Sequence, residues 1–169
     1  MLTKNYYTIA RYFYTGNTFN NYYVYDVNNT QRSPSRDYAY LGAFYYMDNI
    51  AVGDISASTY GIRMGSGTRA PKMTDINLES PIVSGLSIIN RPVRDRVVYS
   101  DRVEYPVSFT VRNTTSEDIT VSELGMFASV GSSYCGILVD RTVLDEPVVI
   151  PAGERRMITY TIVFNDPNM

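Results

Sequence analysis

The chain has 169 residues, of which 44% are hydrophobic, and its formal net charge is −2. This length fits one domain, or one domain with an extension, and the hydrophobic content is that of a globular protein rather than a disordered one. A nearly neutral charge argues against nucleic acid as a partner. The sequence contains no histidine, which excludes imidazole bases, Ser-His pairs and His-ligated metal sites.

Membrane and secretory segments are not expected. A bilayer span needs about 20 consecutive apolar residues, and no run in the sequence approaches that length. Behind Lys4 the apolar residues are interrupted by Arg11, Asn17 and several tyrosines, which argues against a secretory signal. The single Cys135 cannot form an internal disulfide and is interpreted as a small turn or core residue rather than a reactive thiol. We therefore expect synthesis in a reducing cytoplasm and no membrane partner.

Tyrosine and asparagine dominate the first part of the chain, which holds most of the 16 tyrosines. Residues 6–13 carry apolar side chains at helical spacing, residues 22–27 favour a strand, and residues 28–36 are predicted to form a loop. We place a Tyr-rich assembly region at residues 1–56 and a β-sandwich domain at residues 57–169.

Three interpretations of these tyrosines stay open. Tyrosine offers a large, rigid and amphipathic contact area, so an arm that docks on neighbouring subunits is one interpretation. Stacking on carbohydrate is the second, and a contribution to the protein's own fold is the third. The candidate interface residues are Tyr6, Tyr7, Tyr12, Tyr14, Tyr22, Tyr23, Tyr25, Tyr45 and Tyr46.

A glycine-rich stretch at residues 60–71 invites comparison with phosphate-binding loops. No Gly-Lys-Ser/Thr follows it, and no helix-forming segment offers its N-terminus to a phosphate. We expect Gly65 and Gly67 to permit a tight turn with positive φ, followed by more loop through Asp75. The sequence predicts no cofactor.

The last part of the chain reads as antiparallel strands. From Ser100 to Asn113, hydrophobic residues alternate with polar ones, and residues 156–164 repeat the pattern. A period of two indicates strands with one buried and one wet face. Residues 119–127 are a further strand, and the polar turn at residues 113–118 is predicted to cap a hairpin. The Pro151-Ala-Gly153 turn should deliver the last strand. The expected fold is mainly β, an antiparallel β-sandwich.

Carboxylates are the remaining candidates for catalysis, because Asp and Glu alone can support hydrolysis. Asp140 and Arg141 are adjacent, so their side chains should leave a strand on opposite faces. Asp145 and Glu146 precede Pro147 in a predicted turn. Glu123 lies near Gly125 and is expected to pair with Arg141 across strands in a structural role. None of these residues makes an acid/base pair, so we expect no enzyme, no catalytic residue and no metal ligand.

Several motifs in residues 60–165 together resemble structural proteins of tailed-bacteriophage virions. These motifs are Gly65-Ser-Gly-Thr-Arg-Ala-Pro71, Leu78-Glu-Ser-Pro-Ile82, the stretch from Asn113 to Phe127, and Leu138–Glu154 followed by Thr159-Tyr-Thr-Ile162. The resemblance implies an Ig-like or jelly-roll β-sandwich that assembles in many copies, in a virion made in the host bacterial cytoplasm. It implies other virion proteins and copies of the chain itself as partners, and it transfers no catalytic residue.

The sequence therefore predicts a virion component at the head, neck or tail that assembles through its N-terminal region, where the arm would also add a strand to an adjacent subunit. Two other classes stay open. A glycan-binding or host-recognition module would use exposed rings such as Tyr22, Tyr23 and Tyr25. A carboxylate enzyme would need a cleft with two acids about 5–10 Å apart.

Overall fold

A computed structural model describes most of the second part of the chain and three stretches of the first. The described residues are 1–8, 23–32, 53–54, 61–90, 93–94, 97–130 and 135–165. Of the predicted interface residues, Tyr12, Tyr14, Tyr22, Tyr45 and Tyr46 lie outside these ranges, as does the boundary at residues 56/57. Within the described ranges, no helix has the length and apolar character needed to cross a membrane.

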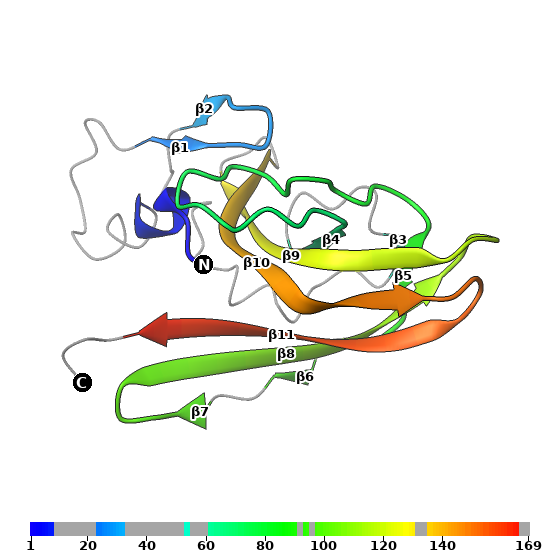
Figure 1. Cartoon of the computed structure of the whole chain (residues 1–169). Coiled ribbons are helices and arrows are strands. Elements are labelled where there is room, and N and C mark those ends of the chain that lie inside the picture. Colours follow the sequence, from blue (N-terminus) through cyan, green and yellow to red (C-terminus); the bar gives the residue numbers. More distant parts are fainter. Residues whose placement is uncertain are drawn as a thin grey trace.

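Antiparallel sheets dominate the molecule, as the sequence predicts. One sheet has the order β10-β9-β4, and a six-stranded sheet has the order β11-β8-β5-β3, with β6 and β7 also paired to β8. The two sheets lie one above the other in Figure 1, and β1 and β2 form a small separate hairpin. The strands are β1 (Val24–Tyr25), β2 (Gln31–Arg32), β3 (Gly53–Asp54), β4 (Gly61–Gly65), β5 (Leu86–Ile88), β6 (Val93–Arg94), β7 (Val97–Val98), β8 (Arg102–Asn113), β9 (Ile119–Val130), β10 (Cys135–Ile150) and β11 (Arg155–Asn165).

One hydrophobic core is shared by the two larger sheets. The alternation predicted for β8 and β11 is confirmed, because their apolar residues point inward while the intervening residues are more exposed. Side chains from β4, β9 and β10 meet them from the other sheet and form one contiguous cluster. The inward residues of β8 and β11 are Val107, Phe109, Val111, Ile158, Tyr160 and Ile162.

The predicted hairpin at residues 113–118 is wrong. β8 pairs with β11 and β9 pairs with β10, so this turn carries the chain from one sheet to the other. Buried Asn113 fixes the crossing: its amide donates to the carbonyls of Glu117 at 2.6 Å and Ile150 at 2.9 Å. Its backbone N–H donates to Glu154 O in the return crossing. The predicted Pro151–Gly153 turn before the last strand is confirmed, and Gly153 supplies its positive φ of 71°.

The predicted turn at Asp145 and Glu146 is also wrong. Both residues lie within β10, where the register with β9 shifts between Val143 and Val148. A second shift lies between Leu138 and Asp140. Extra residues in a strand bulge outward and re-aim the side chains around them without ending the pairing. Local composition therefore suggested a turn where the strand only bulges.

The described N-terminal residues pack onto β10. Leu2 forms an antiparallel bridge with Asp140, and the Thr3 N–H donates to Val139 O at 3.0 Å. Residues 4–8 are helical, which agrees with the start of the helical spacing predicted for residues 6–13. Part of the predicted loop at residues 28–36 is β2 instead, because the buried Asp26 carboxylate accepts the N–H groups of Asn28 and Thr30 and closes a tight turn.

Candidate functional site

Residues 66–82, called here the covering segment, lie over the outer face of β9. Their two ends run side by side: Ser66 N–H donates to Ser80 O at 2.9 Å, and Gly65 bridges Pro81. The buried side chain of Leu78 packs against Phe127 and Leu138 in a second, smaller hydrophobic cluster. Both faces of the central part of β9 are therefore buried, one by the opposite sheet and one by this segment.

A buried ion pair lies beneath the covering segment. The side chains of Glu123 on β9 and Arg141 on β10 have no exposed surface, and Arg141 Nη2 and Nε lie 2.7 and 2.8 Å from Glu123 Oε2. The same carboxylate accepts backbone N–H groups from the covering segment, namely Gly67 at 3.2 Å, Glu79 at 3.1 Å and Ser80 at 2.8 Å. The predicted cross-strand pairing of Glu123 with Arg141 is confirmed.

Further charges extend this pair into the covering segment. Arg141 Nη1 lies 2.8 Å from Asp75 Oδ2, and Asp75 Oδ1 lies 2.8 Å from Arg69 Nη2. The Glu79 carboxylate accepts the N–H groups of Thr68 and Arg69, both at 2.8 Å. A charge buried in a protein needs a partner and hydrogen bonds to offset its loss of water, and each carboxylate here has both. We call Glu123, Arg141, Asp75, Arg69 and Glu79 the ion network.

The pKa shifts of Asp75, Arg141 and Glu79 favour the charged forms of these three groups. Burial alone would raise the Asp75 pKa, but hydrogen bonds from Lys72 N–H, Arg69 and Arg141 outweigh it and lower that pKa. Burial alone would lower the Arg141 pKa, but the bonds to Glu123 and Asp75 outweigh it and raise that pKa. The backbone N–H of Arg69 leads the interactions that lower the Glu79 pKa. The geometry therefore fits a structural role in which these charged groups hold the covering segment against β9 and β10.

The glycines of this region serve close packing, which corrects the predicted reason for them. Positive φ occurs at Gly61, Gly85 and Gly153 but at neither Gly65 nor Gly67. A Cβ at Gly65 would lie 2.7 Å from Ser80 O, and one at Gly67 would lie 2.7 Å from Glu123 Oε1. These glycines are therefore needed because the Glu123 carboxylate and the covering segment approach the backbone too closely for a side chain.

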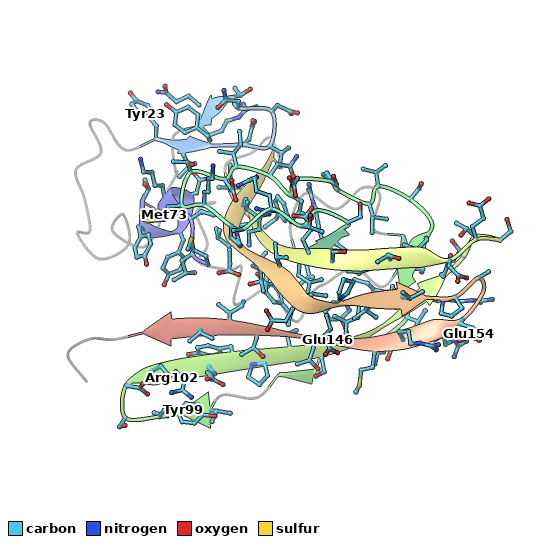
Figure 2. The ribbon with its side chains drawn as sticks, viewed as in Figure 1. Tyr23, Met73, Tyr99, Arg102, Glu146 and Glu154 are labelled. Atoms are coloured by element: carbon cyan, nitrogen blue, oxygen red, sulfur yellow. The ribbon has the colours of Figure 1, made fainter. Side chains whose placement is uncertain are left out.

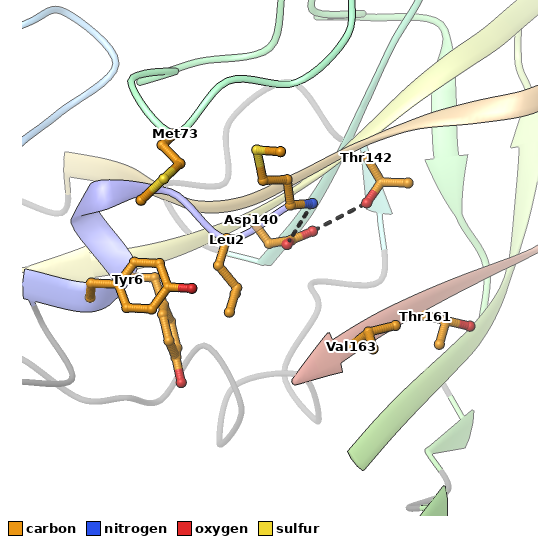
Figure 3. A pocket seen from close by; sticks show the side chains of 9 residues that line it. Leu2, Tyr6, Met73, Asp140, Thr142, Thr161 and Val163 are labelled. Carbon is orange, nitrogen blue, oxygen red and sulfur yellow. Dashed lines mark hydrogen bonds and ion pairs between the residues drawn. The ribbon is translucent and has the colours of Figure 1, made fainter. Parts of the chain in front are cut away.

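Asp140 leaves β10 on the face opposite to Arg141, as predicted. It points between the two sheets, where Tyr160 of β11 donates its hydroxyl to Asp140 Oδ2. Burial leads the causes that raise the Tyr160 pKa well above its ordinary value, with the Asp140 charge adding to it. Thr142 Oγ1 lies 3.3 Å from the same carboxylate oxygen, and the Met1 ammonium lies 3.1 Å from the other (Figure 3).

Asp140 also borders a pocket of about 750 Å³ between the N-terminal residues and the ends of β10 and β11. Most of the described lining is apolar or hydroxylic, with Leu2, Tyr6 and Met73 on one side and Thr161 and Val163 on the other (Figure 3). Asp140 is the one carboxylate among those described lining residues. The pair of acids that a carboxylate hydrolase needs is therefore not found there within the described chain.

The predicted interface tyrosines divide into two kinds where the structure describes them. Tyr6 is half-buried and packs against the main core, which agrees with a role in the protein's own fold. Tyr7, Tyr23 and Tyr25 are exposed, at 52%, 44% and 41% of their surface. Tyr23 stands at the outer margin of the molecule beside β1 (Figure 2). The other five predicted tyrosines lie outside the described residues.

Sequence reasoning missed the acidic residues of the covering segment. Asp75 ended a stretch predicted as loop, and Glu79 was noted only as part of the Leu78–Ile82 motif. Loop composition alone does not say which surface a loop covers. The sequence offered one signal: two acidic residues, Asp75 and Glu79, follow Gly65 and Gly67, the glycines that approach Glu123. Comparisons of the chain with protein families, curated proteins and solved structures found no match.

Replacing Arg141 with Met should destabilise the protein strongly, because Glu123 and Asp75 would lose their buried counter-charge. We expect a loss of about 3–5 kcal/mol in the free energy of unfolding, the usual result of removing one partner of a buried pair. Urea denaturation measures this loss, and hydrogen exchange should show faster exchange in residues 66–82. Arg112→Met, at an exposed position of β8, is the matched control and should change little. Equal losses in the two variants would contradict the structural role of the ion network.

Acid should weaken the covering segment through Asp75. A carboxyl whose pKa is lowered by folding stabilises the protein above its unfolded pKa, and that contribution is lost as the pH falls through the lower, folded value. Asp75→Asn should therefore be less stable than the unaltered chain at neutral pH, and the gap should shrink as the pH falls below the ordinary Asp pKa of 3.8. Urea midpoints across this range measure the gap. A gap that stays constant with pH would contradict the assignment.

Proposed function

We propose that this chain is a structural component of a tailed-phage virion, in the head, neck or tail, and that it works by assembling with other virion proteins and with copies of itself. We further propose that its two sheets form a β-sandwich of the Ig-like or jelly-roll kind. The support is a resemblance in sequence together with the way the resembling residues are used in the fold.

The observation that carries the proposal is where the resembling motifs meet. Residues 65–71 and 78–82 form the two ends of the covering segment, and Glu123 and Arg141 join them through the ion network. Asn113, which begins another of the motifs, ties together the two crossings between the sheets. The motifs thus specify one rigid scaffold, which is what a subunit repeated many times in a shell or tube requires.

The deeply buried carboxylates among the described residues bind groups of the same chain, which suits a scaffold. The four most deeply buried acids, Asp26, Glu123, Asp140 and Asp75, each accept hydrogen bonds from neighbouring groups of the same chain. A catalytic carboxylate needs access to a substrate and a tuned pKa. These carboxylates instead hold turns, sheets and the covering segment in place, and this favours assembly over catalysis.

The surface that we propose for binding neighbours includes the exposed rings of β1. Tyr23 and Tyr25 are two residues apart and point to the same face, while Val24 between them is fully buried in the main core. The rings are therefore held on an anchored backbone, which lowers the entropy lost on binding. Asn5 also fixes this strand, because its side chain exchanges hydrogen bonds with the backbone N–H and C=O of Tyr25, both at 3.0 Å.

The same pair of rings favours a second candidate, a glycan-binding or host-recognition module. Neighbouring aromatic rings that face solvent can stack on sugar rings as readily as on protein side chains. The two candidates differ in what the rings bind and in whether the chain associates with itself or with another virion protein.

Replacing both rings, as Tyr23→Ser with Tyr25→Ser, should weaken assembly without unfolding the protein, because neither residue is part of the buried core. Mass photometry of the full chain should show rings or higher oligomers, and the double variant should show fewer of them. Tyr99→Ser, which removes a ring with 40% exposure near β7, is the matched control and should assemble normally.

Unchanged oligomers in the double variant would contradict a role for these rings in assembly. If the full chain is a monomer, binds immobilised glycans, and loses that binding in the double variant, the recognition module replaces the assembly role.

A further inference from the structure

β10 and β11 each lie at the end of a sheet, and their open edges differ in how far they are protected against pairing with another strand. The edge of β10 is guarded: residues 1–3 pair with it, its register with β9 shifts at two places, and it carries Asp145, Glu146 and Pro147. Partial covering, bulges, charges and proline are the devices by which sheet proteins prevent an edge from recruiting another strand.

Among the residues that the structure describes, none of these devices is found along the central part of β11. It pairs with β8 from Arg155 to Asn165 without a shift in register. The sequence between Met157 and Phe164 contains no charge and no proline. Within the described part of the chain, no strand pairs with the other side of β11, which lies at the end of its sheet (Figure 1). A long strand edge that pairs regularly and has an uncharged central part is a template for pairing.

The backbone groups at the open edge can be assigned from the neighbouring ladder. Ile89 N–H donates to Thr110 O, so the backbone of Thr110 on β8 faces β5. In an antiparallel ladder these directions alternate, so Phe109 and Val111 face β11 and form hydrogen-bonded pairs with Ile158 and Arg156. The N–H and C=O groups of the intervening β11 residues therefore point to the open edge. These residues are Met157, Thr159, Thr161 and Val163.

We propose that this edge pairs with β11 of a second copy of the chain, antiparallel, about a two-fold axis at Tyr160. This residue is the midpoint of the strand, so the register overlaps all of β11. It places Met157 opposite Val163 of the second copy, and Thr159 opposite Thr161. Apolar side chains then meet apolar ones and hydroxyls meet hydroxyls, which are favourable cross-strand pairs.

The charges and the exposed side chains of β11 favour a second copy of the chain as the partner and an antiparallel direction of pairing. Arg155 and Arg156 lie together at the start of β11. An antiparallel pairing holds the arginines of the two copies at opposite ends, whereas a parallel pairing would place them side by side, where like charges repel. Met157 is 72% exposed and Val163 is 38% exposed in the single chain, and the pairing covers both. A symmetric contact of this kind joins the same patch on both copies.

The inference rests on the proposed function in that it supplies one contact between copies of an assembling subunit. Its geometry, however, depends only on the edge of β11. The contact is small, so we expect a dimer that dissociates on dilution rather than an obligate one.

Analytical ultracentrifugation of the full chain over a range of concentrations tests the pairing. Thr159→Pro removes an edge N–H that β8 does not use, and Thr159→Lys places a charge on the edge without altering the backbone. Each should weaken the dimer by at least tenfold, as measured by its dissociation constant. Thr120→Lys, which adds the same charge at an exposed position of β9, should leave the dissociation constant unchanged. Hydrogen exchange should show slower exchange at residues 157–163 when the concentration of the full chain is raised.

A chain that stays monomeric at every concentration, or a dimer equally strong in both Thr159 variants, would overturn the pairing. Because Thr159→Lys keeps every backbone hydrogen bond, the test holds even if the proline variant fails to fold. A monomer that is nevertheless recovered from purified phage particles would overturn this inference and leave the proposed function intact. If the chain forms the β11 dimer but is absent from such particles, the proposed function is overturned and this inference stands.

Discussion

The ion pair between Glu123 and Arg141 is the interaction on which the arrangement of this protein depends. Two full charges lie without exposed surface, and such a pair needs hydrogen bonds from its surroundings to offset its loss of water. The covering segment supplies them to the Glu123 carboxylate, because Gly67, Glu79 and Ser80 direct their N–H groups at it. The pair and the segment therefore depend on each other, and neither is expected to hold its place alone.

The bulge in β10 extends this dependence to the second sheet. The shift in register between Leu138 and Asp140 turns Asp140 toward the space between the sheets while Arg141 faces outward. Arg141 then holds the covering segment, and Asp140 accepts the hydroxyl of Tyr160 from β11. One strand thus anchors both layers that flank it through two adjacent residues of opposite charge.

The parts of this structure that follow from local pattern were predictable from the sequence. Strict alternation identified β8 and β11, and the adjacency of Asp140 and Arg141 placed them on opposite faces of one strand. The pairing of Glu123 with Arg141 followed from their charges and their positions in neighbouring strands. These predictions depend on period and charge, which the sequence displays directly.

Contacts between distant segments were not predictable in the same way. The turn at residues 113–118 has the composition of a hairpin turn, and composition does not reveal that the two strands enter different sheets. Gly65 and Gly67 suggested a turn with positive φ, whereas they are needed for close packing against Glu123. Glu123 is more than 50 residues away in the chain, so this contact leaves no local signal in the sequence. Asp145 and Glu146 suggested a turn, although a bulge accommodates the same residues within β10.

We propose that this two-sheet body, held together by the buried ion network, is a subunit of a larger particle. Quantitative mass spectrometry tests this proposal most directly, on tailed-phage particles produced by the cells that make the chain and washed through a density gradient. We expect the chain to be recovered at a fixed copy number per particle, in a constant ratio to the other virion proteins. Recovery only from the infected-cell lysate, with none in the purified particles, would contradict it.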